Sequence, residues 1–277
     1  MLKNKASPLT FPRLLLTGAA GQLGQVMRPR LKAYCNVLRV SDQKNLGEAQ
    51  AGEELQITDL ANASDMQSLL EGVDAVVHLG GISTEQAWAP ILASNIVGMV
   101  NLYEAARLQG TKRIVFASSN HVTGFYRQDE VIDTKMPPKP DGFYGLSKAF
   151  GEDLAEMYWA RWGIETVSIR IGSALPAPKD RRMLSTWISF DDLERLVVSA
   201  LTAPIVGHTI IFGMSDTQTS WWDNTHAKHL GYRALDSSDV FRSEVEARQP
   251  HIDRHDKAAL FQGGAFVKVA PHGDSIF

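Results

Sequence analysis

The sequence predicts an α/β protein built around a doubly wound parallel sheet, with a small C-terminal lobe. Three observations support this fold class. Short apolar runs are unbroken rather than alternating, which is typical of strands buried on both faces. These runs alternate strictly with longer segments of helical periodicity, as crossover connections require. A glycine-rich turn separates the first apolar run from the first helical segment.

The strands are predicted where the apolar runs occur along the chain. These runs are RLLLTG at 13–18, NVLRVSD at 36–42, DAVVHLGG at 74–81, KRIVFASSN at 112–120 and ETVSIRIGS at 165–173. Helical periodicity marks the segments between them, at 22–33, 65–72, 93–110 and from Tyr144 onward. Strand and helix therefore alternate through residues 12–173, which we predict to form one domain.

The pattern becomes less regular after Ser173, and residues 174–277 are predicted to form the smaller lobe. Residues 174–187 are rich in proline and charge and should be a loop. A helix is expected over 189–204, a strand over 208–213 and a further helix over 222–234. This lobe should cover the carboxyl edge of the sheet, where folds of this class bind ligands. Residues 1–11 are expected to be a flexible arm.

Composition limits the partners and the cellular compartment. The 277 residues carry a formal net charge of -3, so no basic surface is expected that would attract a nucleic acid. The single cysteine, Cys35, excludes an internal disulfide and fits a reducing cytoplasm. No stretch approaches the roughly 18 apolar residues of a membrane-spanning helix. A cytoplasmic protein without a membrane partner is expected.

The turn TGAAGQLG places glycines at 18, 21 and 24 between the first strand and the first helix. Glycines allow a tight turn and let the backbone approach a pyrophosphate at the positive end of the helix. The spacing differs from the commoner Gly-x-Gly-x-x-Gly, but its position between strand and helix supports it. We therefore predict a Rossmann fold that binds a dinucleotide.

Asp42 ends the second strand, 24 residues after Gly18. An acidic side chain there can accept hydrogen bonds from both ribose hydroxyls and would repel a 2′-phosphate, which favours NAD over NADP. The alternative interpretation is a solvated aspartate in a turn. Lys44 nearby leaves the choice of cofactor less strict.

The stretch DGFYGLSKAFGE, residues 141–152, puts Tyr144 four positions before Lys148 on a predicted helix. Residues at this spacing lie on one helix face. The alternative interpretation is purely structural: a surface tyrosine over which a lysine side chain packs would give the same spacing. However, removal of a hydride from an alcohol needs a base for the hydroxyl proton, and a nearby cation favours the phenolate form of a tyrosine.

Several further motifs occur in one order: TDL at 58–60, HLGG at 78–81, NIVG at 95–98, SSN at 118–120 and YGLSK at 144–148. Together with the glycine turn and Asp42 they resemble the extended short-chain dehydrogenase/reductase family. Within it, the stretches HLGGIS, FASSNH, RIGS, RMLSTW, WWDN and FQGG closely resemble the uronate dehydrogenases. The resemblance covers nearly the whole chain after the N-terminal arm.

This resemblance implies a role for each matching residue. The catalytic residues would be Tyr144, Lys148 and Ser119. NAD would be bound by Gly18, Gly21, Gln22, Leu23, Asp42, Asp59, Leu60, Leu79, Gly80, Asn95, Tyr144, Lys148 and Ile171. The substrate would be bound by Ser83, Ser119, Asn120, His121, Tyr144, Ser173 and Arg182. Related enzymes commonly pair through helices, so a homo-oligomer is expected.

The implied reaction is the NAD-dependent oxidation of a hexuronic acid, galacturonate or glucuronate, at its anomeric carbon to an aldarolactone. Arg182 would bind the carboxylate of the hexuronic acid through two hydrogen bonds. Asn120 and His121 stand where dehydratases of this fold carry acidic residues, so they are expected to donate hydrogen bonds to sugar hydroxyls. No metal is expected, because the pairs His226/His229 and His251/His255 lack a third ligand.

Two alternative functions are compatible with the fold. A sugar-nucleotide epimerase would use the same tyrosine and lysine. However, the 129 residues after Lys148 (277 − 148) leave limited room for a nucleotide-diphosphate pocket. A non-catalytic NAD-sensing module would not need the tyrosine–lysine pair. The presence of this pair therefore argues against such a module.

Overall fold

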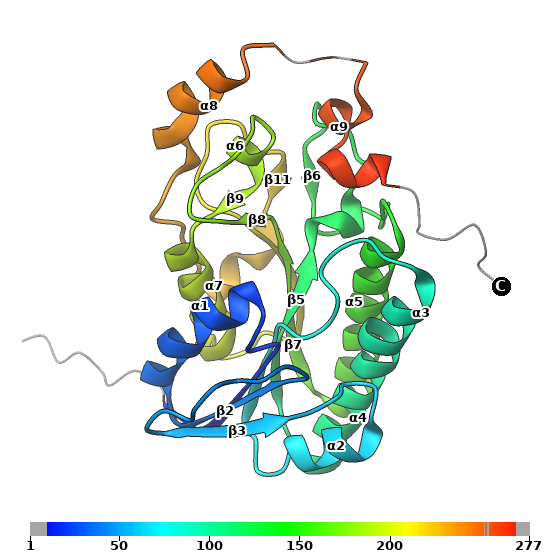
Figure 1. The fold of residues 1–277 in the computed structure, drawn as a ribbon, viewed down its shortest axis with the longest axis vertical. Coiled ribbons are helices and arrows are strands. Elements are labelled where there is room, and N and C mark those ends of the chain that lie inside the picture. Colours follow the sequence, from blue (N-terminus) through cyan, green and yellow to red (C-terminus); the bar gives the residue numbers. More distant parts are fainter. Residues whose placement is uncertain (1–9, 252, 254, 270–277) are drawn as a thin grey trace, which may run out of the picture.

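The computed structural model describes residues 10–251, 253 and 255–269. At its centre is a seven-stranded sheet flanked by helices (Figure 1). In spatial order its strands are β10 (His208–Gly213), β7 (Glu165–Ile171), β5 (Arg113–Ser119), β4 (Ala75–His78), β1 (Phe11–Thr17), β2 (Cys35–Asp42) and β3 (Glu53–Ile57). All neighbouring pairs are parallel, which confirms the predicted doubly wound parallel sheet.

The strand order reverses beside β1. The chain runs outward from β1 through β2 to β3, then returns to the other side of β1 and continues from β4 to β10. In such sheets, ligands bind in the crevice outside the carboxyl ends of the strands that flank this switch point. The topology therefore indicates a ligand site at the carboxyl ends of β1 and β4.

Helices cover both faces of the sheet. On one face lie α1 (Gln22–Leu31) and α7 (Phe190–Thr202), and on the other lie α2 (Ala63–Leu69), α4 (Gly98–Gln109) and α5 (Phe143–Trp162). The clusters of buried side chains that fill the two interfaces are separate. Each strand is thus buried on both sides, which is why its apolar run is unbroken.

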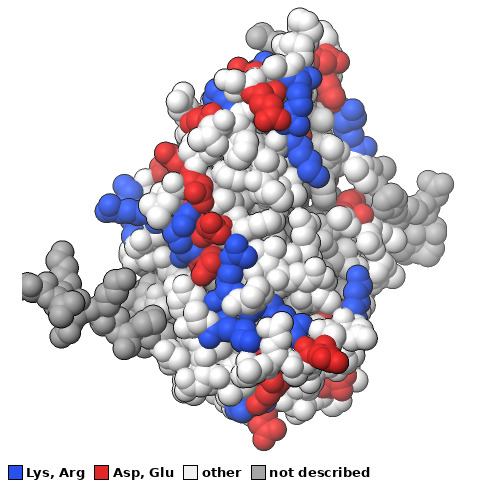
Figure 2. Space-filling model, turned by 60° about the vertical axis from the view of Figure 1, so that its left-hand side comes forward, with Lys and Arg blue, Asp and Glu red and all other residues white. Residues whose placement is uncertain are grey.

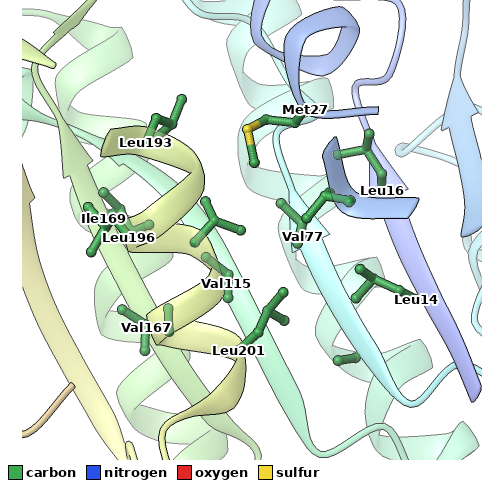
Figure 3. Close-up of a cluster of buried hydrophobic side chains, with 14 of the residues drawn as sticks. Leu14, Leu16, Met27, Val77, Val115, Val167, Ile169, Leu193, Leu196 and Leu201 are labelled. Atoms are coloured by element: carbon green, nitrogen blue, oxygen red, sulfur yellow. The ribbon is translucent and has the colours of Figure 1, made fainter. Parts of the chain in front are cut away.

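The core under α1 and α7 illustrates this packing (Figure 3). Met27 of α1, Leu193 of α7 and Leu16 of β1 belong to one cluster of side chains in this core, and all three are fully buried. Leu15, between two residues of that cluster, faces the opposite core. Burial of a leucine side chain stabilises the folded state by about 1.5–3 kcal/mol.

A smaller set of elements lies above the sheet in Figure 1. It consists of α6 (Met183–Thr186), α8 (Arg242–Arg248), α9 (Lys257–Leu260), β6 (Ile132–Asp133), β8 (Ser173–Ala174), β9 (Trp187–Ile188) and β11 (Trp222–Asp223). β11 pairs with β6, and Phe261 bridges to Arg127. This lobe thus also uses residues that precede the predicted boundary at Ser173. Conversely, β10 and α7 follow that boundary and belong to the sheet layers.

Some elements differ from the sequence-based expectations. Residues 222–234 contain β11 and a 3₁₀ helix, Thr225–Leu230, instead of an α-helix. The Asn224 side chain bonds both backbone groups of Phe212 and so ties the start of this segment to β10. The charged edge strand β3 was not predicted, since Glu53 and Glu54 interrupt its apolar pattern. The predicted N-terminal arm lies outside the described residues up to residue 9, and Phe11 already belongs to β1.

Three more segments are more finely divided than predicted. The first helix ends at Leu31 and is followed by a 3₁₀ turn, Lys32–Tyr34. The helical segment before β5 begins with α3 (Trp88–Ile91) and a π-helical turn, Leu92–Val97, ahead of α4. The predicted loop at 174–187 contains α6 and two very short strands.

Acidic and basic side chains are interspersed on the surface that Figure 2 shows. Arg30 of α1 pairs with Asp191 of α7 at 3.0 Å, and Arg13 pairs with Glu54 of β3 at 3.0 Å. Among the described residues, no helix combines the length and the hydrophobicity that crossing a bilayer requires.

Candidate active site

A cavity of about 600 Å³ opens at the carboxyl ends of the central strands. It extends from the glycine turn after β1 to the start of α5, and it brings together residues that are far apart in the sequence. Of the predicted site residues, its lining includes Gly18, Gly21, Gln22, Leu23, Asp42, Leu60, Leu79, Gly80, Ser83, Ser119, Asn120, His121, Tyr144, Lys148 and Ile171.

The glycine turn has the backbone geometry that a dinucleotide site needs. Gly18 has a φ of 69°, and a Cβ there would lie 2.6 Å from the backbone of Leu79. A Cβ on Gly24 would lie 2.1 Å from the Gly18 carbonyl oxygen, so this glycine lets α1 pack closely on β1. No side chain caps α1 at Gly21. Its first N–H groups therefore fit a bound pyrophosphate.

Asp42 lines the cavity at the end of β2, where a ribose binder is expected. Its two carboxylate oxygens also accept backbone hydrogen bonds at 3.0 Å, one from Ala20 in the glycine turn and one from Lys44. Asp42 therefore holds the turn in place as well as presenting its charge to the cavity.

Two predicted cofactor residues are outside the lining of this cavity. The Asp59 carboxylate accepts from the Gln43 side chain at 2.7 Å and from the Ala61 N–H at 2.9 Å. Asn95 lies in the π-helical turn and bonds the backbone N–H and carbonyl of Ile82 at 2.8 and 3.0 Å. Its amide also donates to Ser147, beside Lys148. Asn95 therefore links the loop at Ile82 to α5 beside Lys148 and supports the site from outside the cavity.

Helix α5, which carries Tyr144 and Lys148, begins against a carboxylate from another part of the chain. The N–H groups of Phe143 and Tyr144 each donate to one oxygen of Glu85 at 2.9 Å. Negative charge is favourable at a helix N-terminus. A Cβ at position 142 would lie 2.2 Å from Glu85, so Gly142 permits this close approach. No local motif marks Glu85, which was not predicted.

Tyr144 and Lys148 face the cavity and are both buried. Burial raises the pKa of Tyr144 to about 12, and a hydrogen bond with Ser119 opposes this shift. Burial lowers the pKa of Lys148 to about 8. The Lys148 ammonium donates to the Ala117 carbonyl at 2.8 Å and lies 5.8 Å from the centre of the Tyr144 ring. The chain's own groups thus favour the neutral phenol.

Glu152 continues the same face of α5 one turn beyond Lys148. It accepts two hydrogen bonds from the Arg170 guanidinium of β7, at 3.0 and 2.8 Å, and one from Ser118 of β5 at 2.6 Å. Arg170 is 1% exposed. This buried cluster fixes α5 against β5 and β7, whose last residues line the cavity.

A second cavity, of about 310 Å³, adjoins the first and shares Asn120 and His121 with it. The predicted substrate residues Ser173 and Arg182 line it. The Arg182 Nε donates to the Gln262 carbonyl at 2.6 Å. With the Asn120 amide oriented by its partners, its oxygen accepts from Arg182 at 2.8 Å and its nitrogen donates to the Ile171 carbonyl at 3.1 Å.

The C-terminal segment contributes residues to this second cavity that sequence reasoning did not assign to the site. Phe266 lines it and stacks on His121, with ring centroids 3.8 Å apart. Gly264 has a φ of 63°, and a Cβ there would lie 2.6 Å from the Arg182 side chain. The stretch FQGG, at 261–264, is the sequence pattern that could have indicated a role for this segment in the site. Among the described residues, no group of three histidine, cysteine, aspartate or glutamate side chains could hold a metal ion.

Comparisons with known proteins agree with this geometry. Residues 14–203 match the NAD dependent epimerase/dehydratase family. The chain belongs to this family. It is 54% identical over 265 residues to a uronate dehydrogenase of Pseudomonas syringae pv. tomato, with 95% of this chain and 96% of that one covered.

Solved structures give the same result. A glucuronic acid dehydrogenase from Chromohalobacter salexigens is 48% identical, with a TM-score of 0.94 and coverage of 96% of this chain and 100% of that one. A mutant uronate dehydrogenase from Agrobacterium tumefaciens, complexed with NAD, is 46% identical, with a TM-score of 0.92 and coverage of 94% and 98%. The predictions of an NAD-dependent oxidoreductase and of NAD as cofactor are confirmed.

The Asp42 contacts predict how cofactor choice depends on this residue. Asp42→Ala should weaken NAD binding about tenfold or more, because a charged hydrogen-bond acceptor for the ribose is lost. NADP binding should weaken less, since the repulsion of its 2′-phosphate is also removed. Fluorescence titration with both cofactors measures this, and Asp129→Ala, at an exposed aspartate that pairs with Arg127, is the control. An unchanged ratio of the two dissociation constants would leave Asp42 only its structural role.

Proposed function

We propose that this protein oxidises hexuronic acids, with galacturonate and glucuronate as substrates, at the anomeric carbon to give an aldarolactone and NADH. The observation that carries the proposal is the Arg182 guanidinium in the second cavity, which adjoins the cavity that Ser119 and Tyr144 line. A guanidinium recognises a carboxylate through two parallel hydrogen bonds. A sugar acid would thus be held with its other end toward the catalytic residues. Similarity to proteins that are named uronate dehydrogenase and glucuronic acid dehydrogenase supports the proposed substrate class.

In the mechanism that we infer, the protein binds NAD, orients the substrate and accepts the proton of its hydroxyl group. The glycine turn, Asp42 and Lys148 hold NAD, which when bound supplies a positively charged ring that accepts hydride. Ser119 orients the anomeric oxygen by a hydrogen bond. Tyr144 takes the hydroxyl proton as the carbon–oxygen double bond forms, and the hydride leaves from carbon.

The main energetic demand is the ionisation of Tyr144. A shift of its pKa from about 12 to near 7 requires about 7 kcal/mol of preferential stabilisation of the phenolate. Lys148 supplies part of this, because with a pKa of about 8 it is mostly charged at neutral pH. The positive charge of the bound cofactor and the Ser119 hydroxyl supply the remainder. Low dielectric strengthens each of these interactions.

Mixing the purified protein with NAD and either uronate tests the proposal. The absorbance of reduced nicotinamide should rise, and Tyr144→Phe should slow turnover about 10²- to 10⁴-fold while NAD binding is retained. Full activity of Tyr144→Phe would remove the proposed base. Tightly retained NAD without net NADH would favour an epimerase, and NAD binding without any turnover would favour an NAD-sensing module.

The carboxylate site gives a second kinetic prediction. Arg182→Ala should raise the Michaelis constant for uronates about 10- to 100-fold, since a charged hydrogen-bond pair is lost. The Michaelis constant for NAD should stay the same. Arg181→Ala is the matched control, because Arg181 bonds Gln249 at the surface. Equal effects of the two substitutions would place the carboxylate elsewhere.

We also propose a homo-oligomer that forms through α4 and α5, in the cytoplasm. Several large apolar side chains are exposed on these helices and on the π-helical turn before α4: Leu92, Val97, Val100, Leu108, Leu146, Met157 and Trp162. Sedimentation should find oligomers that Leu108→Glu dissociates. Leu235→Glu, at an exposed apolar residue in the lobe, should not dissociate them. A monomeric wild-type protein would contradict this proposal.

A further inference from the structure

His121 is held by contacts on several sides. Its Nδ1 lies 2.7 Å from an oxygen of Asp141. Its ring stacks on Phe266 at an interplanar angle of 23° and meets Tyr144 edge-on at 5.7 Å between centroids. Because His121 lines both cavities and its Nδ1 is engaged by Asp141, Nε2 is the ring nitrogen available to a ligand.

The carboxylate of Asp141 occupies a space that three glycines leave free. A Cβ on Gly124 or on Gly263 would lie 2.0 Å from its Oδ2, and a Cβ on Gly145 would lie 3.2 Å from its Oδ1. These glycines come from separate segments: the end of the 3₁₀ turn Asn120–Thr123 that follows β5, the C-terminal FQGG stretch, and α5. The Asp141 side chain is fully buried between them. Its contact with His121 is therefore built into the fold.

We propose that Asp141 is a positioning residue that fixes His121 as the tautomer with hydrogen on Nδ1, so that Nε2 accepts a hydrogen bond from a uronate hydroxyl instead of donating one, as was expected from the sequence. An ionised carboxylate only accepts hydrogen bonds, so the hydrogen between the two side chains belongs to His121. Once Nδ1 carries it, neutral Nε2 has a free lone pair. The role of the hydroxyl rests on the proposed function, whereas the tautomer does not.

Burial, more than the surrounding charges, favours the neutral imidazole. Burial lowers the pKa of His121, and the charge of Arg182 acts in the same direction. Asp141 and Glu85 oppose this without reversing it. A neutral His121 does not compete with Arg182 for the substrate carboxylate. The two residues therefore distinguish the ends of the sugar acid: Arg182 binds the anionic group, and His121 binds a hydroxyl that donates.

Nitrogen NMR of the full chain labelled with ¹⁵N-histidine measures the tautomer directly. At neutral pH we expect His121, identified by comparison with His121→Asn, to carry its hydrogen on Nδ1. In Asp141→Asn the new amide can donate to Nδ1, so the hydrogen should move to Nε2. A wild-type His121 that is charged, or that carries its hydrogen on Nε2, would overturn the proposal without any variant being needed.

Kinetics test the consequence of the tautomer. Asp141→Asn should lower kcat/KM for uronates about 10- to 100-fold, because Nε2–H would face a donor hydroxyl. NAD affinity should not change. The control is Asp133→Asn, which alters another histidine pair, with His226 at 3.3 Å on the surface, and should leave the kinetics unchanged.

Each result separates the two proposals. Unchanged kcat/KM in Asp141→Asn, or an equal loss of NAD affinity, would overturn the positioning role. If the wild-type protein oxidises neither uronate, the proposed function and the hydroxyl contact both fail, while the NMR result still decides whether Asp141 sets the tautomer.

Discussion

Desolvation of Tyr144 and Lys148 is the constraint on which the site depends. Burial moves both groups toward their neutral forms, with a pKa of about 12 for the phenol and about 8 for the ammonium. A phenol in this state is a poor base on its own. In the proposed mechanism it becomes a base when further positive charge and a hydrogen-bond donor lie close to it in a low-dielectric cleft. The fold must therefore position Ser119 and the cofactor accurately.

The fold achieves this by fixing α5 at several levels. Glu85 holds its first N–H groups, Asn95 bonds Ser147 beside the lysine, and Glu152 joins it to Arg170 and Ser118. Tyr144, Lys148 and Glu152 are each four residues apart and so share one helix face. A buried charge such as Glu152 is tolerated because its partners supply the hydrogen bonds that water would otherwise provide.

The C-terminal segment completes the second cavity. The Gln262 side chain accepts from Trp222 at 2.9 Å and donates to the carbonyls of Arg127 and Glu130, so the segment is secured to the lobe. Its backbone then holds Arg182, and Gly263 leaves room for Asp141. This gives a physical reason for the two glycines of the FQGG stretch: a side chain at Gly263 would displace Asp141, and one at Gly264 would displace Arg182.

The sequence by itself determined the parallel sheet, the glycine turn and the Tyr144–Lys148 pair, because each follows from contacts within a few residues or from unbroken burial. It did not reveal the edge strand β3, whose charges interrupt the apolar pattern. Nor did it reveal that Glu85, Asp141 and Phe266 meet around α5. Their pairing joins segments 20 to 145 residues apart (121 to 141, 121 to 266), and only tertiary packing brings such groups within hydrogen-bonding or stacking distance.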